Sequence, residues 1–181
     1  MTVIALVPVK NESLRLPGKN YLDFDGSPLW EHKIKQLKEA AFFDQIYVGS
    51  DSTNILELAV SHGCEGIYRS GLEVDEVGGS ANLMIREFSR KVQEAKIKGS
   101  ANYIDPICFW VHVTNPLVGA GVYQAALDKF IEVKPKGHDS LISVTSERNH
   151  AWFLDGDNYK PLNFSPKAAK HQLASNLSPV K

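Results

Sequence analysis

The sequence predicts a three-layer, Rossmann-like α/β fold, in which a mostly parallel sheet carries helices on both faces. Strand-like and helix-like segments alternate along the chain, which is typical of βαβ units. A β-branched apolar run at residues 3–9 leads directly into a loop rich in basic and turn-forming residues. Because 181 residues with 43% hydrophobic content can bury one core, we expect a single domain over residues 1–181.

The first strand is expected at Val3–Val9, where the apolar run indicates a buried strand. A turn at Asp25-Gly26 and a proline at position 28 then introduce an amphipathic helix. Its apolar face is expected to hold Leu29, Trp30, Ile34, Leu37 and Ala41. Its lysines at positions 33, 35 and 38 are expected to be solvated on the opposite face.

The second strand is expected at Gln45–Gly49, followed by the capping cluster Ser50–Ser52 and a helix that Gly63 ends. A third strand is expected at Cys64–Tyr68, and a long helix from about residue 81 to residue 98. The next strand, Pro106–Val113, is apolar nearly throughout, which predicts a central strand covered on both faces.

The last part of the pattern is a helix at Gly119–Val133 and a fifth strand at Ser140–Thr145. Residues 155–181 are rich in Pro, Asn, Lys and Ser and have weak periodicity. No repeat, low-complexity tract or interdomain linker interrupts the sequence.

The loop after the first strand has the chemistry of a phosphate cradle. Lys10, Arg15 and Lys19 are spaced among turn-formers at the carboxyl end of the strand, where an open α/β sheet holds its ligands. Ser13 can donate a hydrogen bond to a phosphate oxygen, and Pro17-Gly18 gives a tight turn that allows close backbone approach. The loop fits neither the Walker pattern nor G-x-G-x-x-G. A merely solvated basic loop is the alternative.

The string PVKNESLRLPGKN, residues 8–20, resembles the signature of the acylneuraminate (CMP-sialic acid) cytidylyltransferases, which reads Pro-Ala-Arg-x-x-Ser-Lys-Gly-x-Pro-x-Lys-Asn. The residues in register with it are Pro8, Ser13, Pro17, Lys19 and Asn20. Lys10 replaces the usual arginine, and residues 13–19 are closer to the KDO cytidylyltransferases. The motif therefore indicates the sugar nucleotidyltransferase superfamily and leaves the sugar open.

Residues 112–117, HVTNPL, resemble the Gln-Pro-Thr-Ser-Pro-Leu-Arg segment of the same family. His112 stands at the glutamine that contacts the nucleotide there, and Val118 stands at the arginine. A histidine at this place is equally explained as a satisfied core residue. The segment lacks the Gln-Gly-Asp-Glu-Pro of the KDO enzymes, which favours the sialic acid branch.

The resemblance implies a cytidylyltransferase that joins CTP to an acidic nonulosonic sugar and releases pyrophosphate. Because that reaction needs cations at the phosphates, we expect Lys19 at the α-phosphate and Arg15 and Lys10 at the outer phosphates, with Lys19 and Arg15 in catalytic roles. Nucleotide-binding roles are expected for Lys10, Ser13, Asn20, Arg69, Ser80 and His112, and sugar-binding roles for Asn115, His150 and Lys170. It also implies the nucleotide-diphospho-sugar transferase fold and a homodimer.

Magnesium is expected from the resemblance alone, and its protein ligands are unknown. Family members continue into a last segment with two aspartates that hold Mg²⁺, and residues 1–181 do not supply them. Asp23, Asp25 and Asp51 are better explained as turn and cap residues, and residues 73–76 as an acidic surface loop. A fragment, an altered use of metal and a loss of catalysis are the open explanations.

Composition limits the remaining possibilities. A net charge of −1 argues against nucleic acid as a partner. The sequence has no signal peptide and no apolar run long enough for a bilayer, so we expect a cytoplasmic protein without membrane contact. Cys64 and Cys108 are expected to be buried free thiols. A KDO-type or other sugar nucleotidyltransferase, and a nucleotide-binding scaffold without activity, remain alternative functions.

Overall fold

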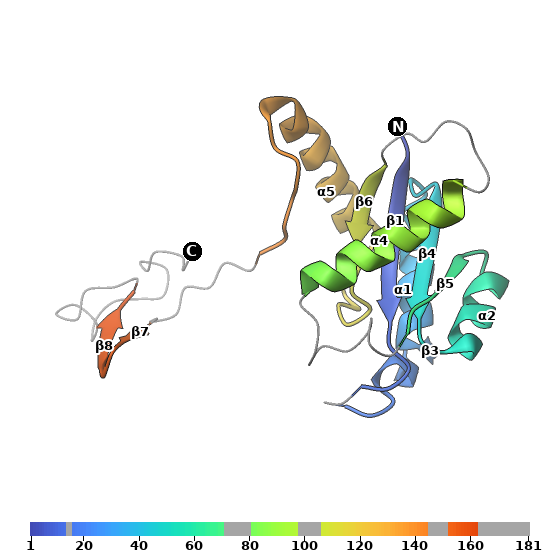
Figure 1. Cartoon of the computed structure of the whole chain (residues 1–181), viewed down its shortest axis with the longest axis horizontal. Coiled ribbons are helices and arrows are strands. Elements are labelled where there is room, and N and C mark those ends of the chain that lie inside the picture. The colour runs from blue at the N-terminus through green and yellow to red at the C-terminus, as the bar shows by residue number, and fades with distance from the viewer. Residues whose placement is uncertain (14–15, 71–80, 98–105, 145–151, 163–181) are drawn as a thin grey trace. The chain divides into compact units, whose positions relative to one another are not determined.

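A computed structural model describes residues 1–13, 16–70, 81–97, 106–144 and 152–162 of the chain. It divides the chain into two compact units, Met1–Lys136 and Gly137–Lys181. The first unit holds a parallel sheet with helices on both faces, which confirms the predicted fold class (Figure 1). No helix among the described residues has both the length and the apolar character needed to cross a membrane.

The sheet of the first unit has four parallel strands in the order β5-β4-β1-β6. Their bounds are Val3–Val9 for β1, Gln45–Ser50 for β4, Glu65–Tyr68 for β5 and Ile107–Trp110 for β6. The buried run at β1 was predicted to the residue, and this strand pairs with β4 on one side and β6 on the other. Because all four strands are parallel, the loops that follow them leave from the same edge of the sheet.

Along the chain, a helix lies between each strand of this parallel sheet and the next, as a βαβ pattern requires. The helices are α1 (Leu29–Glu39), α2 (Thr53–Ser61), α4 (Ala81–Ile97) and α5 (Ala120–Val133). Shorter elements are η1 (Lys19–Tyr21), β2 (Asp23–Phe24), β3 (Ser27–Pro28) and η2 (Lys134–Lys136). The predicted turn at Asp25-Gly26 joins β2 to β3, and both residues have the positive φ that such a tight turn needs.

The core lies on both faces of β1, because successive side chains of a strand point to opposite faces. Ala5 and Val7 belong to a buried cluster that includes side chains of α1, α2 and α5. Ile4 and Leu6 face the other way, toward Phe88 and Val92 of α4. Figure 1 shows α4 crossing one side of the sheet alone. Phe88 is fully buried and so fixes α4 against the strands that carry the site.

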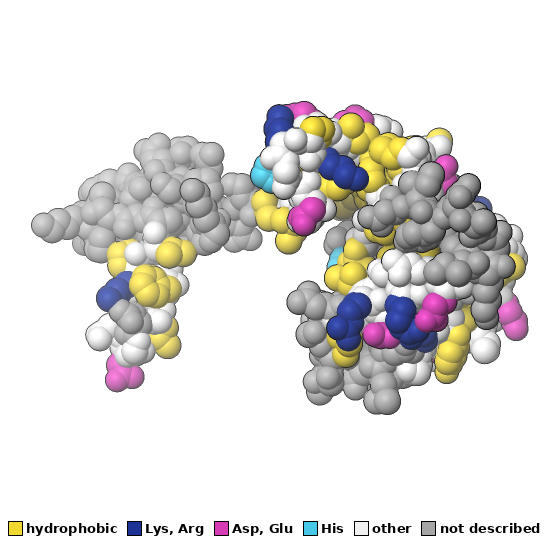
Figure 2. Space-filling model, turned by 45° about the horizontal axis from the view of Figure 1, so that its top comes forward, with side chains coloured by type: hydrophobic (Ala, Val, Ile, Leu, Met, Phe, Trp, Pro, Cys, Tyr) yellow, Lys and Arg dark blue, Asp and Glu magenta, His cyan; other side chains and the backbone are white. Residues whose placement is uncertain are grey.

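The outer face of α4 is a row of opposite charges. Arg90 forms ion pairs with both Glu87 and Glu94, and Arg86 lies 3.7 Å from Glu87. Figure 2 shows dark blue and magenta side chains lying side by side on one face of the molecule. Exposed pairs of this kind add little to stability, so the packing of Phe88 rather than this row holds α4 on the sheet.

The predicted ends of α2 are confirmed. The Ser52 side chain accepts a hydrogen bond from the backbone N–H of Ile55 at 3.4 Å, which caps the first turn. Gly63 follows the helix with φ at 69°, the left-handed conformation that glycine adopts at low cost. The chain then enters β5, as the sequence predicts.

The prediction of a central fourth strand was wrong for the described residues. The segment Pro106–Val113 forms the shorter strand β6, which is the outer strand of the four-stranded sheet. Cys108 is exposed rather than buried, because an outer strand leaves part of its surface to solvent. Cys64 is a buried free thiol as predicted, and its burial raises the pKa of the thiol.

The prediction for the lysines of α1 was wrong at Lys33. This side chain is 0% exposed, whereas Lys35 and Lys38 lie on the surface as expected. Lys33 stands beside the apolar residue Ile34, at the border of the apolar face, and α5 and the preceding loop cover that border. Ala41 was also misplaced, because it lies beyond the end of α1 with φ at 59° and is exposed.

The second unit contains a hairpin that the weak periodicity did not predict. Strands β7 (Trp152–Asp155) and β8 (Asn158–Pro161) pair in antiparallel register through a turn at Gly156 and Asp157. The predicted fifth strand does not appear within residues 140–144, where the structure has no strand. An alternating apolar pattern gives a strand only where a partner accepts its backbone hydrogen bonds.

Candidate functional site

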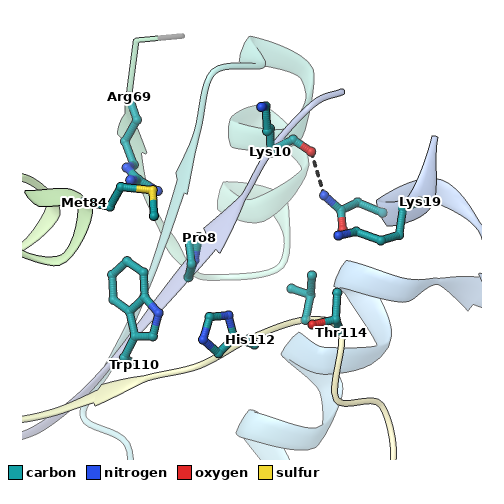
Figure 3. Close-up of a pocket in the computed structure, with 10 residues that line it drawn as sticks. Pro8, Lys10, Lys19, Arg69, Met84, Trp110, His112 and Thr114 are labelled. Carbon is teal, nitrogen blue, oxygen red and sulfur yellow. Dashed lines mark hydrogen bonds between the residues drawn. The ribbon is translucent and has the colours of Figure 1, made fainter. Parts of the chain in front are cut away.

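A cleft of about 130 Å³ lies at the carboxyl ends of the strands in the first unit (Figure 3). Its walls come from the ends of β1, β5 and β6, from η1 and from α4. The lining residues are Pro8, Lys10, Lys19, Asn20, Arg69, Met84, Trp110, His112, Val113 and Thr114. This is the edge at which an open parallel sheet binds ligands.

The loop after β1 is held from three directions. The backbone N–H of Asn11 donates to Asp51 Oδ1 at 2.8 Å, and Tyr21 donates its hydroxyl proton to Asn11 Oδ1 at 2.7 Å. The buried amide of Asn20 donates to the Lys10 carbonyl at 2.6 Å, the bond drawn in Figure 3. These bonds close the loop onto the end of β4, so Lys10 and Lys19 face the cleft from a fixed backbone.

Asp51 therefore positions the loop. We expect Asp51→Ala to weaken the affinity for a nucleotide by about tenfold, because losing a charged acceptor costs about 1.5–3 kcal/mol and leaves the Asn11 N–H unsatisfied. Calorimetric titration with CTP measures this. Asp51→Asn keeps an acceptor oxygen and should bind nearly as wild type does. Equal affinities for the alanine variant and wild type would contradict the role.

Arg69 is the best-buried cation of the cleft, at 2% exposure. Its backbone N–H donates to the Ser50 carbonyl at 2.8 Å, which continues the pairing of β5 with β4. Its guanidinium lies over the ring of Phe88, with Cζ 5.1 Å from the ring centroid. Figure 3 shows Arg69, Met84 and Trp110 along one side of the cleft, away from Lys19.

The segment after β6 supplies the opposite wall. The backbone N–H of Val111 donates to the Leu6 carbonyl at 3.0 Å, so the extended pairing continues past Trp110. Val111 and Val113 are buried, whereas His112 and Thr114 are exposed and line the cleft. Side chains therefore alternate between the core and the cleft along this segment. His112 lies on the cleft side and is not a satisfied core histidine.

The structure places some of the predicted site residues in the cleft and others outside it. The cleft brings together Lys10, Lys19, Asn20, Arg69 and His112. Ser13 does not line it, and its hydroxyl oxygen instead accepts the Leu16 N–H at 3.3 Å. Asn115 lies just past the cleft wall, with its carbonyl bonded to α1. The other predicted residues, Arg15, Ser80, His150 and Lys170, lie outside the described residues.

Sequence reasoning missed part of the cleft wall. Met84 and Trp110 contribute side chains that no motif singled out. Trp110 is the last residue of β6, so the rule that ligands bind beyond the carboxyl ends of strands could have identified it. Met84 lies on α4, four residues before the buried Phe88, and only the packing of that helix brings it to the cleft.

The electrostatic character of the cleft is cationic. Lys10, Lys19 and Arg69 line it, and no carboxylate does so among the described residues. Fixed cations at the end of a sheet attract an anion with several charges, such as a polyphosphate. The described residues also contain no group of three or more His, Cys, Asp or Glu side chains that could hold a metal. Mg²⁺ takes oxygen ligands from substrate phosphates and water as well as from one or two carboxylates, and no carboxylate lines the cleft among the described residues.

Known proteins with similar sequences and structures include several nucleotidyltransferases. A family model described as cytidylyltransferase matches residues 4–149. Pseudaminic acid cytidylyltransferase of Campylobacter jejuni is 25% identical over 173 residues, which cover 88% of this chain and 70% of that protein. N-acylneuraminate cytidylyltransferase A of Danio rerio is 27% identical over 169 residues, 91% of this chain and 36% of that protein.

A solved structure of CMP-2-keto-3-deoxy-manno-octonic acid synthetase complexed with CTP is similar to this chain at a TM-score of 0.53. The two sequences are 19% identical, and the match covers 73% of this chain and 48% of that one. At this identity the likeness supports the fold.

Proposed function

This chain belongs to the cytidylyltransferase family of nucleotidyltransferases, and we propose that it activates an acidic nonulosonic sugar with CTP. The observation that carries the proposal is the cleft lined by Lys10, Lys19 and Arg69 at the carboxyl edge of the sheet. The relatives named above act on acidic sugars of this class. The products would be a CMP-sugar and pyrophosphate.

In the proposed reaction, an oxygen of the sugar hydroxyl attacks the α-phosphorus of CTP. The new P–O bond forms as the bond to the β-phosphate oxygen breaks, and pyrophosphate leaves with that electron pair. The hydroxyl proton passes to solvent. Because the phosphate oxygens carry the developing charge, positioned cations are the main contribution that this chain can make.

The geometry suggests one orientation of the nucleotide. Lys19 and Lys10 lie at the end of the cleft where the loop after β1 closes, which suits the phosphates. Arg69, Met84 and Trp110 form the other end, which suits the base. In this orientation Lys19 serves the α-phosphate and Lys10 the outer phosphates, while Asn20 and His112 lie near the ribose. The role of Arg15 at the outer phosphates stays a prediction from the sequence. Mg²⁺ remains a proposal from the family resemblance, and no step here depends on it.

An assay of pyrophosphate release tests the proposal. CTP would be offered with a sialic-type acid, a pseudaminic-type acid or KDO, each with and without Mg²⁺, and ATP, GTP and UTP would be the matched nucleotide controls. We expect release that depends on CTP and on a nonulosonic acid. Release with KDO but with neither of the other two acids would show that KDO, and not the proposed sugar, is the substrate. Tight binding of CTP without release would indicate a nucleotide-binding scaffold. Failure to bind any nucleotide would overturn the assignment.

A further inference from the structure

Helix α1 contacts the loop between β6 and α5 through a row of side-chain bonds to its backbone. The Lys33 ammonium donates to the carbonyls of Asn115 at 2.8 Å and Val118 at 2.9 Å. Gln36 donates its amide proton to the Pro116 carbonyl at 2.6 Å, and His32 Nε2 lies 3.3 Å from the same oxygen. Neighbouring carbonyls of one short loop are thus bonded by side chains of one helix.

Lys33, the central residue of this row, is fully buried, and burial is unfavourable for a charged side chain. Lys33 is 0% exposed, and its Nζ lies 5.4 Å from the centroid of the Tyr123 ring on α5. Burial lowers the pKa of Lys33 to about 8, so at pH 7 the side chain carries a charge that is cut off from water. An apolar side chain of similar length would avoid that cost. The two loop carbonyls and the Tyr123 ring are the partners that compensate this buried charge, so the charge ties α1 to one arrangement of the loop and α5.

The loop that Lys33 contacts has few internal backbone hydrogen bonds between residues 112 and 118. Its internal backbone bonds are long, at 3.4 Å from Asn115 N to the His112 carbonyl and 3.2 Å from Val118 N to the Asn115 carbonyl. It is irregular between β6 and α5, and its first residues include His112 and Thr114 of the cleft wall. Val111 and Val113 anchor the start of this segment in the core, and the bonds from α1 hold its second half, at residues 115–118.

We propose that Lys33 is a positioning residue that sets nucleotide affinity from outside the cleft, by holding the Asn115 and Val118 carbonyls. Lys33 does not line the cleft, so its effect must pass through the loop backbone to His112 and Thr114. The choice of a nucleotide as ligand rests on the proposed function, but the clamp itself rests on the bonds alone.

The test compares Lys33→Met with wild type and with Lys35→Met, a matched control on the exposed face of the same helix. Hydrogen–deuterium exchange of the ligand-free proteins measures the loop directly. We expect Lys33→Met to speed exchange across residues 112–118 about tenfold while β1 and β4 keep their protection. The midpoint of urea unfolding at pH 7 should change little, because the loss of a desolvated charge offsets the cost of leaving the Asn115 and Val118 carbonyls without their donor. Lys35→Met should match wild type in both measurements.

The second readout is the dissociation constant for CTP, which we expect to rise about tenfold in Lys33→Met. Unchanged exchange in the loop, or faster exchange throughout the sheet, would overturn the proposal. Gln36→Met removes only the bond to Pro116 and gives a smaller effect on the same amides, should Lys33→Met not fold. If wild type fails to bind CTP, the proposed function fails, while the exchange data still decide whether the clamp exists.

Discussion

Lys19→Ala is expected to lower the turnover of CTP by about 100-fold, the effect of removing one donor that stabilises developing charge. Lys19 begins η1 beside the buried Asn20, and it lines the cleft at its phosphate end. Truncation at Cβ leaves the backbone bond from Lys19 N to the Leu16 carbonyl intact, so the loop should keep its fold. Initial rates of pyrophosphate release over a range of CTP concentrations give kcat and KM separately.

The size of the effect on kcat distinguishes transition-state stabilisation from simple binding. A variant with raised KM and unaltered kcat would show that Lys19 holds the ground state equally well, and that result would contradict a catalytic role. Lys35→Ala is the control for loss of a positive charge, because Lys35 is exposed on α1 and takes no part in the cleft. Its kinetic constants should equal those of wild type.

Gly49→Ala is expected to weaken CTP binding by at least about tenfold and to destabilise the fold by about 1–3 kcal/mol. A Cβ at Gly49 would lie 2.6 Å from Arg69 Cδ and 2.6 Å from Phe88 Cζ, closer than real contacts allow. Both neighbours are nearly fully buried, so neither can move aside cheaply. The added methyl group should push the Arg69 guanidinium away from its place over the Phe88 ring.

Gly66→Ala on the adjacent strand is the matched control. Its Cβ would meet the Leu56 side chain at 3.4 Å, an ordinary contact, so a smaller change in stability and no change in CTP affinity are expected. Urea unfolding and calorimetric titration measure the two quantities for both variants. Wild-type affinity in Gly49→Ala would show that the cleft tolerates a displaced Arg69, and the proposed place of the base would then be wrong.

Local signals in the sequence were sufficient for the elements whose cause is itself local. The run at β1 and the cap and stop residues of α2 were predicted correctly, because backbone preferences and short-range hydrogen bonds decide them. The loop motif also identified Lys10, Lys19 and Asn20 as neighbours. These residues are close along the chain, so one turn brings them together.

Errors arose where a distant segment decides the environment. Lys33 was predicted to be solvated on the exposed face of its helix, and the partners that bury it lie more than 80 residues away in the sequence. Cys108 was predicted to be buried from its apolar neighbours in the sequence. Those neighbours do not reveal that β6 is the outer strand of the described sheet, which leaves Cys108 exposed. Helical or strand periodicity gives the direction of a side chain but not what lies opposite it.

The sequence alone determined the alternating strands and helices, the cationic loop after β1 and, through its motifs, the resemblance to a family that the comparisons then confirmed. Only the tertiary structure decided that Arg69 and His112 stand in one cleft with that loop, that Gly49 leaves room for Arg69, and that Lys33 bonds the loop that follows the facing wall. The physical reason is that these contacts join segments far apart in the chain, and their geometry depends on strand order and side-chain packing, which no short pattern records.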